Sequence, residues 1–263
     1  MLKIPIVDDA GTPVWPEMFP LHKIDALRDT VGARHFASQM MLNPMPPERI
    51  RLDPGALHFY DYEFDTINAR IGDVCITGAT VYWDPSMAGQ HSDGSVCVLV
   101  YRNDKTHCIF IHDVMYMRIL ENDEYPMAHQ CNEVLNFMLH HNMHRICVET
   151  NGIGNTLPEI LRDCAVRCGC DIVVQRVVNN KRKSDRIIDT IEPILSTGRL
   201  YCASRVKTTP LLAEMIGWSP VGYTGHDDGL DALAGAISST PVPIRPMGRA
   251  TQIYSANTKF KIS

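Results

Sequence analysis

No stretch of this sequence is long and apolar enough to cross a membrane. Charged residues interrupt every apolar run well short of the roughly 18 residues that a membrane span needs. The N-terminus also lacks the basic and then apolar pattern of a signal peptide. We therefore expect a compact protein that acts in the cytoplasm and has no membrane partner.

A disulfide framework is absent as well. The nine cysteines are an odd number, and most lie inside apolar strand-like or helix-like runs. This pattern predicts buried free thiols. A zinc site built from three histidines and three cysteines stays open, but their spacing is not that of a zinc finger. The six residues are His140, His141, His144, Cys164, Cys168 and Cys170.

An overall excess of positive charge is also missing. The net charge of -5 argues against a protein whose whole surface is built to bind nucleic acid. Basic residues are nevertheless concentrated locally: residues 181–207 hold seven Lys or Arg against three acids, and residues 241–263 hold four bases and no acid. Both segments could face phosphate groups.

The length of 263 residues and the hydrophobic content of 45% allow one substantial domain with an appendage. Residues 1–65 are rich in proline and resemble a linker, with short helical patterns near 21–31 and 33–42. Residues 70–240 form the main domain, and residues 241–263 an extended basic tail.

The order of apolar patterns within residues 70–240 predicts an α/β fold. Strands are expected at 76–84, 95–102, 107–117, 145–149, 171–178 and 199–203, and helices at 124–142, 156–169, 184–197, 208–217 and 228–239. The first three strands are close enough for hairpins, whereas the later strands alternate with helices and must pair in parallel. The result is a mixed sheet, three antiparallel strands and then parallel ones, with helices on both faces.

Carboxylates lie at the ends of predicted elements. Asp84 closes a strand before Pro85, Glu149 closes another strand before a glycine-containing turn, and an acidic cluster opens the last helix. The cluster consists of Asp227, Asp228 and Asp231. Taken alone, Asp227 or Asp228 would be an ordinary helix N-cap.

The co-occurrence of these acids predicts a metal site. Carboxylates brought close together repel one another unless a cation neutralises them. Hard oxygen ligands select Mg²⁺ or Mn²⁺. Two such ions about 3.5–4 Å apart would activate a water and stabilise the leaving oxygen of a phosphodiester.

A resemblance to a known family rests on several segments, which are residues 83–94, 148–154, 183–187, 198–200 and 226–233, with 15–17, 36–39 and 43–44 earlier in the chain. Together they resemble the nuclease half of the large terminase subunit of tailed bacteriophages. The resemblance implies a ribonuclease H-like fold and a metal-dependent endonuclease that cuts double-stranded DNA during genome packaging. Residues 1–65 then resemble the end of the terminase ATPase half, although the chain has no Gly-x-x-x-x-Gly-Lys-Ser/Thr phosphate loop.

The resemblance also assigns roles to individual residues. Asp84, Glu149, Asp228 and Asp231 would be catalytic and, with Asp227, would hold two Mg²⁺ or Mn²⁺ ions; Asp231 and Asp228 rank above Asp227. Asp93 would be structural. The basic segment adds a predicted DNA-binding set. Its members are Lys181, Arg182, Lys183, Arg186 and Arg199.

The implied partners are double-stranded DNA, the terminase ATPase half, the small terminase subunit and the portal protein, in the cytoplasm of a bacterial host. Two alternatives remain. One is a resolvase or transposase-type nuclease with the same fold and metals. The other is a non-catalytic docking module of the packaging motor, in which the acids only cap helices.

Overall fold

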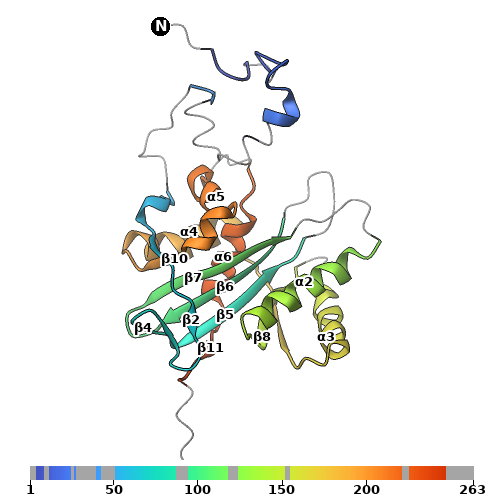
Figure 1. Ribbon diagram of the computed structural model, residues 1–263, viewed down its shortest axis with the longest axis vertical. Helices are drawn as coiled ribbons and strands as arrows, with labels where there is room; N and C mark the ends of the chain where they lie inside the picture. The colour runs from blue at the N-terminus through green and yellow to red at the C-terminus, as the bar shows by residue number, and fades with distance from the viewer. Residues whose placement is uncertain are drawn as a thin grey trace, which may run out of the picture.

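The computed structural model describes residues 4–8, 12–24, 27, 40–42, 51–86, 94–117, 124–151, 155–220 and 225–246. A mixed sheet with the strand order β1-β10-β7-β6-β5-β8-β9 forms its centre (Figure 1). The strands are β1 (His58–Tyr60), β5 (Gly78–Asp84), β6 (Ser95–Asn103), β7 (Cys108–Met117), β8 (Arg145–Glu149), β9 (Val173–Val177) and β10 (Leu200–Ala203).

The strand directions confirm the predicted fold class. β5, β6 and β7 pair antiparallel, while β8 runs parallel to β5 and β9 parallel to β8. On the other side, β10 runs parallel to β7 and β1 parallel to β10. The central strands β5 and β6 are buried almost throughout, which explains their continuous apolar runs.

Helices cover both faces of the sheet. They are α2 (Pro126–His140), α3 (Leu157–Arg167), α4 (Lys183–Ser196), α5 (Leu211–Gly217) and α6 (Asp228–Ser238). Figure 1 shows α2 and α3 beside one another and α4, α5 and α6 grouped together away from them, with α6 passing behind the strands. Within the described ranges, no helix is both long and apolar enough to span a membrane.

The structure extends the predicted boundaries of the main domain. Strand β1 lies within the segment predicted as an appendage, yet it pairs with β10 at the edge of the main sheet. A small antiparallel sheet follows, formed by β2 (Phe64–Asp65), β3 (Arg70–Ile71) and β4 (Val74–Cys75). At the other end, β11 (Val242–Pro243) pairs with the start of β5 and so belongs to the main sheet. These strands are too short to produce a periodic pattern.

The predicted starting residue of one helix is wrong. The helix expected over 208–217 begins at Leu211, where α5 starts, and Thr208 instead ends a 3-10 turn, η5 (Ser204–Thr208). Pro210 separates the two and occupies the N-cap position of α5, because its ring fixes φ and its nitrogen has no hydrogen to donate. Another 3-10 turn, η3 (Pro54–Ala56), precedes β1.

The described part of the N-terminal segment has its own small apolar cluster. Val7 and Ile24 are buried there, with Phe19 packed against them, apart from the core of the main domain. Residues 21–24 are helical, while most of the predicted helical patterns at 21–31 and 33–42 lies outside the described residues. The cysteines are free, as predicted, although Cys75 and Cys168 are exposed.

A close contact sets the distance between α6 and the sheet. Tyr82 on β5 is fully buried, and its ring lies against Gly235 of α6. A Cβ atom at Gly235 would lie 2.5 Å from Cε1 of that ring and 2.8 Å from the hydroxyl oxygen, closer than atoms can pack. Glycine at this position therefore lets α6 approach β5.

We expect Gly235→Ala to destabilise the protein by about 1–3 kcal/mol, the usual effect of overpacking a core. Helix propensity alone would predict the opposite sign, since alanine is favoured over glycine by about 1 kcal/mol. Urea unfolding measures the difference, with Ser196→Ala on the exposed part of α4 as the control. An unfolding free energy equal to or above that of the wild type would contradict the close packing.

Candidate active site

Two predicted acids end neighbouring parallel strands. Asp84 is the last residue of β5 and Glu149 the last residue of β8. Trp83 pairs with Val148 in the register of these strands. The next residue on each strand is the acid, so Asp84 and Glu149 lie side by side at the same edge of the sheet. Their predicted proximity is a direct result of parallel pairing.

Helix α6 brings the acidic cluster to this edge. Asp228 is its first residue and Asp231 lies one turn later; both are 4% exposed. The carboxylate of Asp228 accepts a hydrogen bond of 2.7 Å from the backbone N–H of Gly94, which precedes β6. Asp227 occupies the N-cap position, but its side chain makes no capping hydrogen bond.

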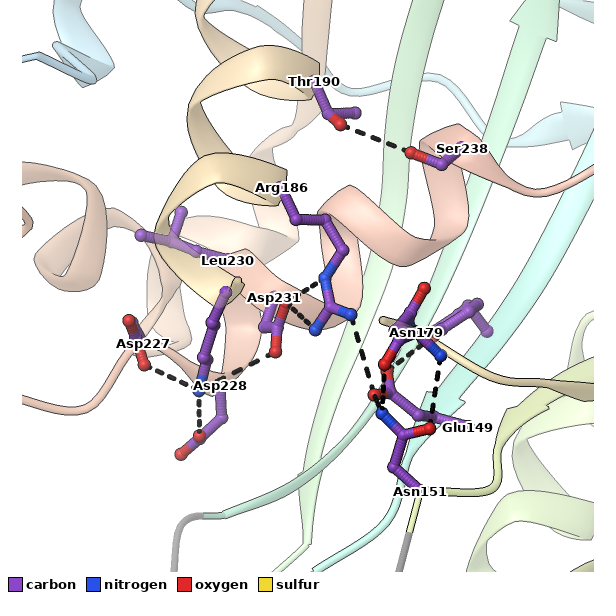
Figure 2. A network of polar contacts seen from close by, with 12 residues as sticks. Glu149, Asn151, Asn179, Arg186, Thr190, Asp227, Asp228, Leu230, Asp231 and Ser238 are labelled. Carbon is purple, nitrogen blue, oxygen red and sulfur yellow. Dashed lines mark hydrogen bonds and ion pairs between the residues drawn. The ribbon is translucent and has the colours of Figure 1, made fainter. Parts of the chain in front are cut away.

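Two cations from the first turn of α4, Lys183 and Arg186, hold these acids, and Figure 2 shows Arg186 between Asp231 and Glu149. The Nζ of Lys183 lies 2.7 Å from Asp227, 3.1 Å from Asp228 and 3.9 Å from Asp231. Arg186 donates to Oδ1 of Asp231 through Nε at 2.7 Å and also through Nη2, and its Nη1 lies 3.7 Å from Glu149. Among the described residues, neither cation makes an ion pair with Asp84.

Glu149 lies in a set of hydrogen-bond donors that were not predicted. Its Oε2 accepts from the Tyr82 hydroxyl at 2.7 Å and from the Asn179 amide at 2.8 Å. Its Oε1 accepts from Asn151 at 3.1 Å. Figure 2 shows both asparagine side chains directed at Glu149. Each asparagine lies two residues beyond the end of a parallel strand, a position that could have indicated them.

Burial and the nearness of other acids raise the pKa values of two carboxyl groups in the site. Burial raises the pKa of Asp84 well above its usual value, and the charges of Glu149 and Asp231 raise it further. Burial also raises the pKa of Asp231, against the lowering effect of Arg186 and Lys183. Five carboxylates thus face two cations, which leaves an excess of negative charge.

A further acid next to the site, Glu214 on α5, was missed by the sequence analysis. It is 5% exposed, and burial raises its pKa to about 8. Its carboxyl group accepts hydrogen bonds from the Tyr116 hydroxyl and from the backbone N–H of Leu230 in α6. In the sequence, Glu214 is one acid within a helical pattern, with no signal that its side chain is buried.

The predicted DNA-binding residues do not share one environment. Lys183 and Arg186 face the carboxylates described above. Lys181 is exposed and pairs with Asp189 at 2.9 Å, Arg182 is exposed at the N-cap of α4, and Arg199 donates to Thr197. Asp93 lies outside the described residues.

The described residues contain no three His, Cys, Asp or Glu side chains arranged to hold a metal ion as they stand. The zinc alternative therefore gains no support: His141, for example, pairs with Asp113 at 2.9 Å. At the acidic site, the donor chemistry still fits a hard cation, because oxygen ligands converge and Lys183 occupies a place where positive charge is required.

Comparison with known proteins agrees with the predicted resemblance. Residues 83–200 match the family model described as Terminase Bacteriophage T7, Ribonuclease H-like domain. This stretch begins one residue before Asp84 and includes Glu149, Lys183 and Arg186. The chain matches no curated protein.

Solved structures with the same fold include two viral nuclease domains. The P22 large terminase nuclease domain has a TM-score of 0.51 and 14% identity, covering 76% of this chain and 95% of that one. The human cytomegalovirus terminase nuclease domain, Mn soaked and inhibitor bound, has a TM-score of 0.50 and 15% identity, covering 73% and 93%. At identities this low, the structural similarity shows a shared fold, in agreement with the ribonuclease H-like family model.

We expect Lys183→Met to lower the metal-free unfolding free energy by about 1–3 kcal/mol. A fully buried pair would cost about 3–5 kcal/mol when broken, but one third of the Lys183 side chain is exposed. Without Lys183, the pKa values of Asp84 and Asp231 in the folded state should rise further above those in the unfolded state. Ionising these two carboxyl groups at higher pH then favours the unfolded state. The loss of unfolding free energy should therefore be larger at pH 8 than at pH 5.

Denaturant unfolding in the presence of EDTA measures this effect. Lys181→Met is the matched control, since Lys181 is an exposed lysine of the same segment and pairs with Asp189, outside the acidic site. Equal losses in the two variants, or a loss independent of pH, would contradict the role of Lys183 as the cation among the acids.

Proposed function

We propose, from the match of residues 83–200 to the ribonuclease H-like domain of terminases, that the chain is a metal-dependent endonuclease that cuts double-stranded DNA during phage genome packaging. The observation that carries the proposal is the convergence of acids from β5, β8 and α6 at one edge of this fold. The P22 relative is a terminase nuclease domain, and the cytomegalovirus relative was soaked with Mn. No feature of the described residues favours a resolvase, a transposase-type nuclease or a docking module.

The acids would hold divalent metal. Asp84, Glu149, Asp228 and Asp231 supply hard oxygen ligands, and Asp227 lies beside them. Asp84 is the best placed to accept an ion, because neither Lys183 nor Arg186 is paired with it among the described residues. Two ions, Mg²⁺ or Mn²⁺, would neutralise the excess negative charge. When bound, they would generate a nucleophilic water and stabilise the leaving oxygen of the phosphodiester.

The chain's own residues fix the geometry before metal arrives. Tyr82, Asn151 and Asn179 orient the Glu149 carboxylate from three separate segments. Arg186 lies between Glu149 and Asp231 and so links the end of β8 to α6. Lys183 neutralises part of the charge of the α6 acids, and binding of divalent metal would weaken this attraction.

DNA would approach along the basic residues near the start of α4. Lys181 and Arg182 would supply sequence-independent contacts to phosphate there, and Arg199, beyond the other end of α4, would supply one further along the surface. Lys183 and Arg186 would hold the acids in place rather than bind DNA phosphates, because both side chains are directed at carboxylates. The terminase ATPase half, the small terminase subunit and the portal protein, in a bacterial host cytoplasm, remain proposed partners and location.

The test is cleavage of supercoiled plasmid in the presence of Mn²⁺. Asp84→Asn and Asp231→Asn should each reduce the rate by more than the roughly 10–100-fold typical of residues around a metal ligand. Far-ultraviolet circular dichroism should show an unchanged fold. Asp163→Asn, at an exposed position of α3, is the matched control and should cut like the wild type. Cleavage at the wild-type rate by either active-site variant would show that the assignment is wrong.

A further inference from the structure

The helix that carries two of the proposed ligands does not cap its own N-terminus. The first N–H groups of a helix have no partner within the helix and usually take one from the N-cap side chain. Asp227 holds that position in α6, but its carboxylate lies 2.7 Å from Lys183 and accepts from the indole N–H of Trp218 at 3.2 Å. The N–H groups of the first turn therefore need another acceptor.

Glu214 provides this acceptor from a different helix. Its Oε2 accepts a hydrogen bond of 3.0 Å from the backbone N–H of Leu230, which lies between Asp228 and Asp231. Its Oε1 accepts a hydrogen bond of 2.9 Å from the hydroxyl of Tyr116 on β7. A buried side chain thus joins α5, β7 and the first turn of α6.

The packing around Gly229 shows how close this arrangement is. A Cβ atom at Gly229 would overlap the Tyr116 hydroxyl and would lie 2.9 Å from Oε2 of Glu214. Only glycine leaves room for the pair at the second residue of α6. The position of the helix start is therefore fixed both by hydrogen bonds and by steric contact.

We propose that Glu214, held by Tyr116, is a positioning residue that sets the orientation of the α6 ligands. It acts through the Leu230 N–H rather than by contact with metal or DNA. The inference deepens the proposed function and rests on it, since Asp228 and Asp231 are taken there as metal ligands. Its structural part, the fixing of the first turn of α6, can be measured without cleavage.

Two substitutions at one position separate hydrogen bonding from packing. Glu214→Met keeps a long side chain but removes both acceptors, whereas Glu214→Gln keeps one carbonyl oxygen that can accept from Leu230 N–H. If Glu214 only filled space, Glu214→Met would preserve the structure of α6 at least as well as Glu214→Gln, because methionine buries no polar group. Leu211→Met on the same helix is the matched control, a volume-conserving change that leaves the hydrogen bonds in place.

In the full chain, three quantities would be measured for each variant: amide hydrogen exchange of a peptide covering residues 228–233, Mn²⁺ affinity by calorimetry, and plasmid cleavage against the concentrations of Mn²⁺ and of DNA. For Glu214→Met we expect faster exchange and a Kd for Mn²⁺ higher by about 10–100-fold. The KM for DNA should not change. Glu214→Gln should restore most of both losses, and Leu211→Met should behave like the wild type.

Wild-type exchange and Mn²⁺ affinity in a folded Glu214→Met variant would overturn the inference, as would equal losses in Glu214→Gln. If Glu214→Met does not fold, Tyr116→Phe takes its place: it removes one hydroxyl and should raise the Kd for Mn²⁺ in the same direction, and an unchanged Kd overturns the proposal. Failure of the wild type to cut DNA would count against the proposed function alone, because the exchange result would still decide whether Glu214 fixes α6.

Discussion

The arrangement of the site depends on two cationic side chains of α4, which pair with four of its five carboxylates. Lys183 contacts the three acids of the α6 region, and Arg186 lies between Glu149 and Asp231. Without these charges, the folded state would bring like charges together with little solvent to screen them. The first turn of α4 therefore stabilises the approach of α6 to the ends of β5 and β8.

The fold could be predicted from the sequence wherever an element was long enough to show a period. The strands from β5 to β10 and most helices lie within a few residues of their predicted ranges, because apolar runs and proline or glycine boundaries mark them. Strands β1 to β4 and β11, of two or three residues each, could not be predicted. β1 and β11 pair with β10 and β5, which are distant in the sequence, whereas β2, β3 and β4 pair with one another but are too short to show a period.

The positions of the strand-end acids could be predicted from the sequence, whereas the contacts of the residues around them could not. Asp84 and Glu149 each end a strand, and parallel pairing places strand ends together. Lys183 and Arg186 were noticed as positive charges, but the choice between phosphate and carboxylate as their partner is made by tertiary packing. Glu214 and Tyr82 carried no local signal, since only the fold places their oxygen atoms beside Leu230 and Glu149.

The contact between Tyr82 and Gly235 has a consequence for sequence variation in this domain. The same tyrosine packs against α6 with its ring and holds Glu149 with its hydroxyl, so the spacing between helix and sheet and the orientation of an acid on β8 share one side chain. A residue larger than glycine at position 235 would displace that ring. A substitution one turn beyond Asp231, on the buried side of α6, could thus impair an acid on another element while leaving every acidic residue in place.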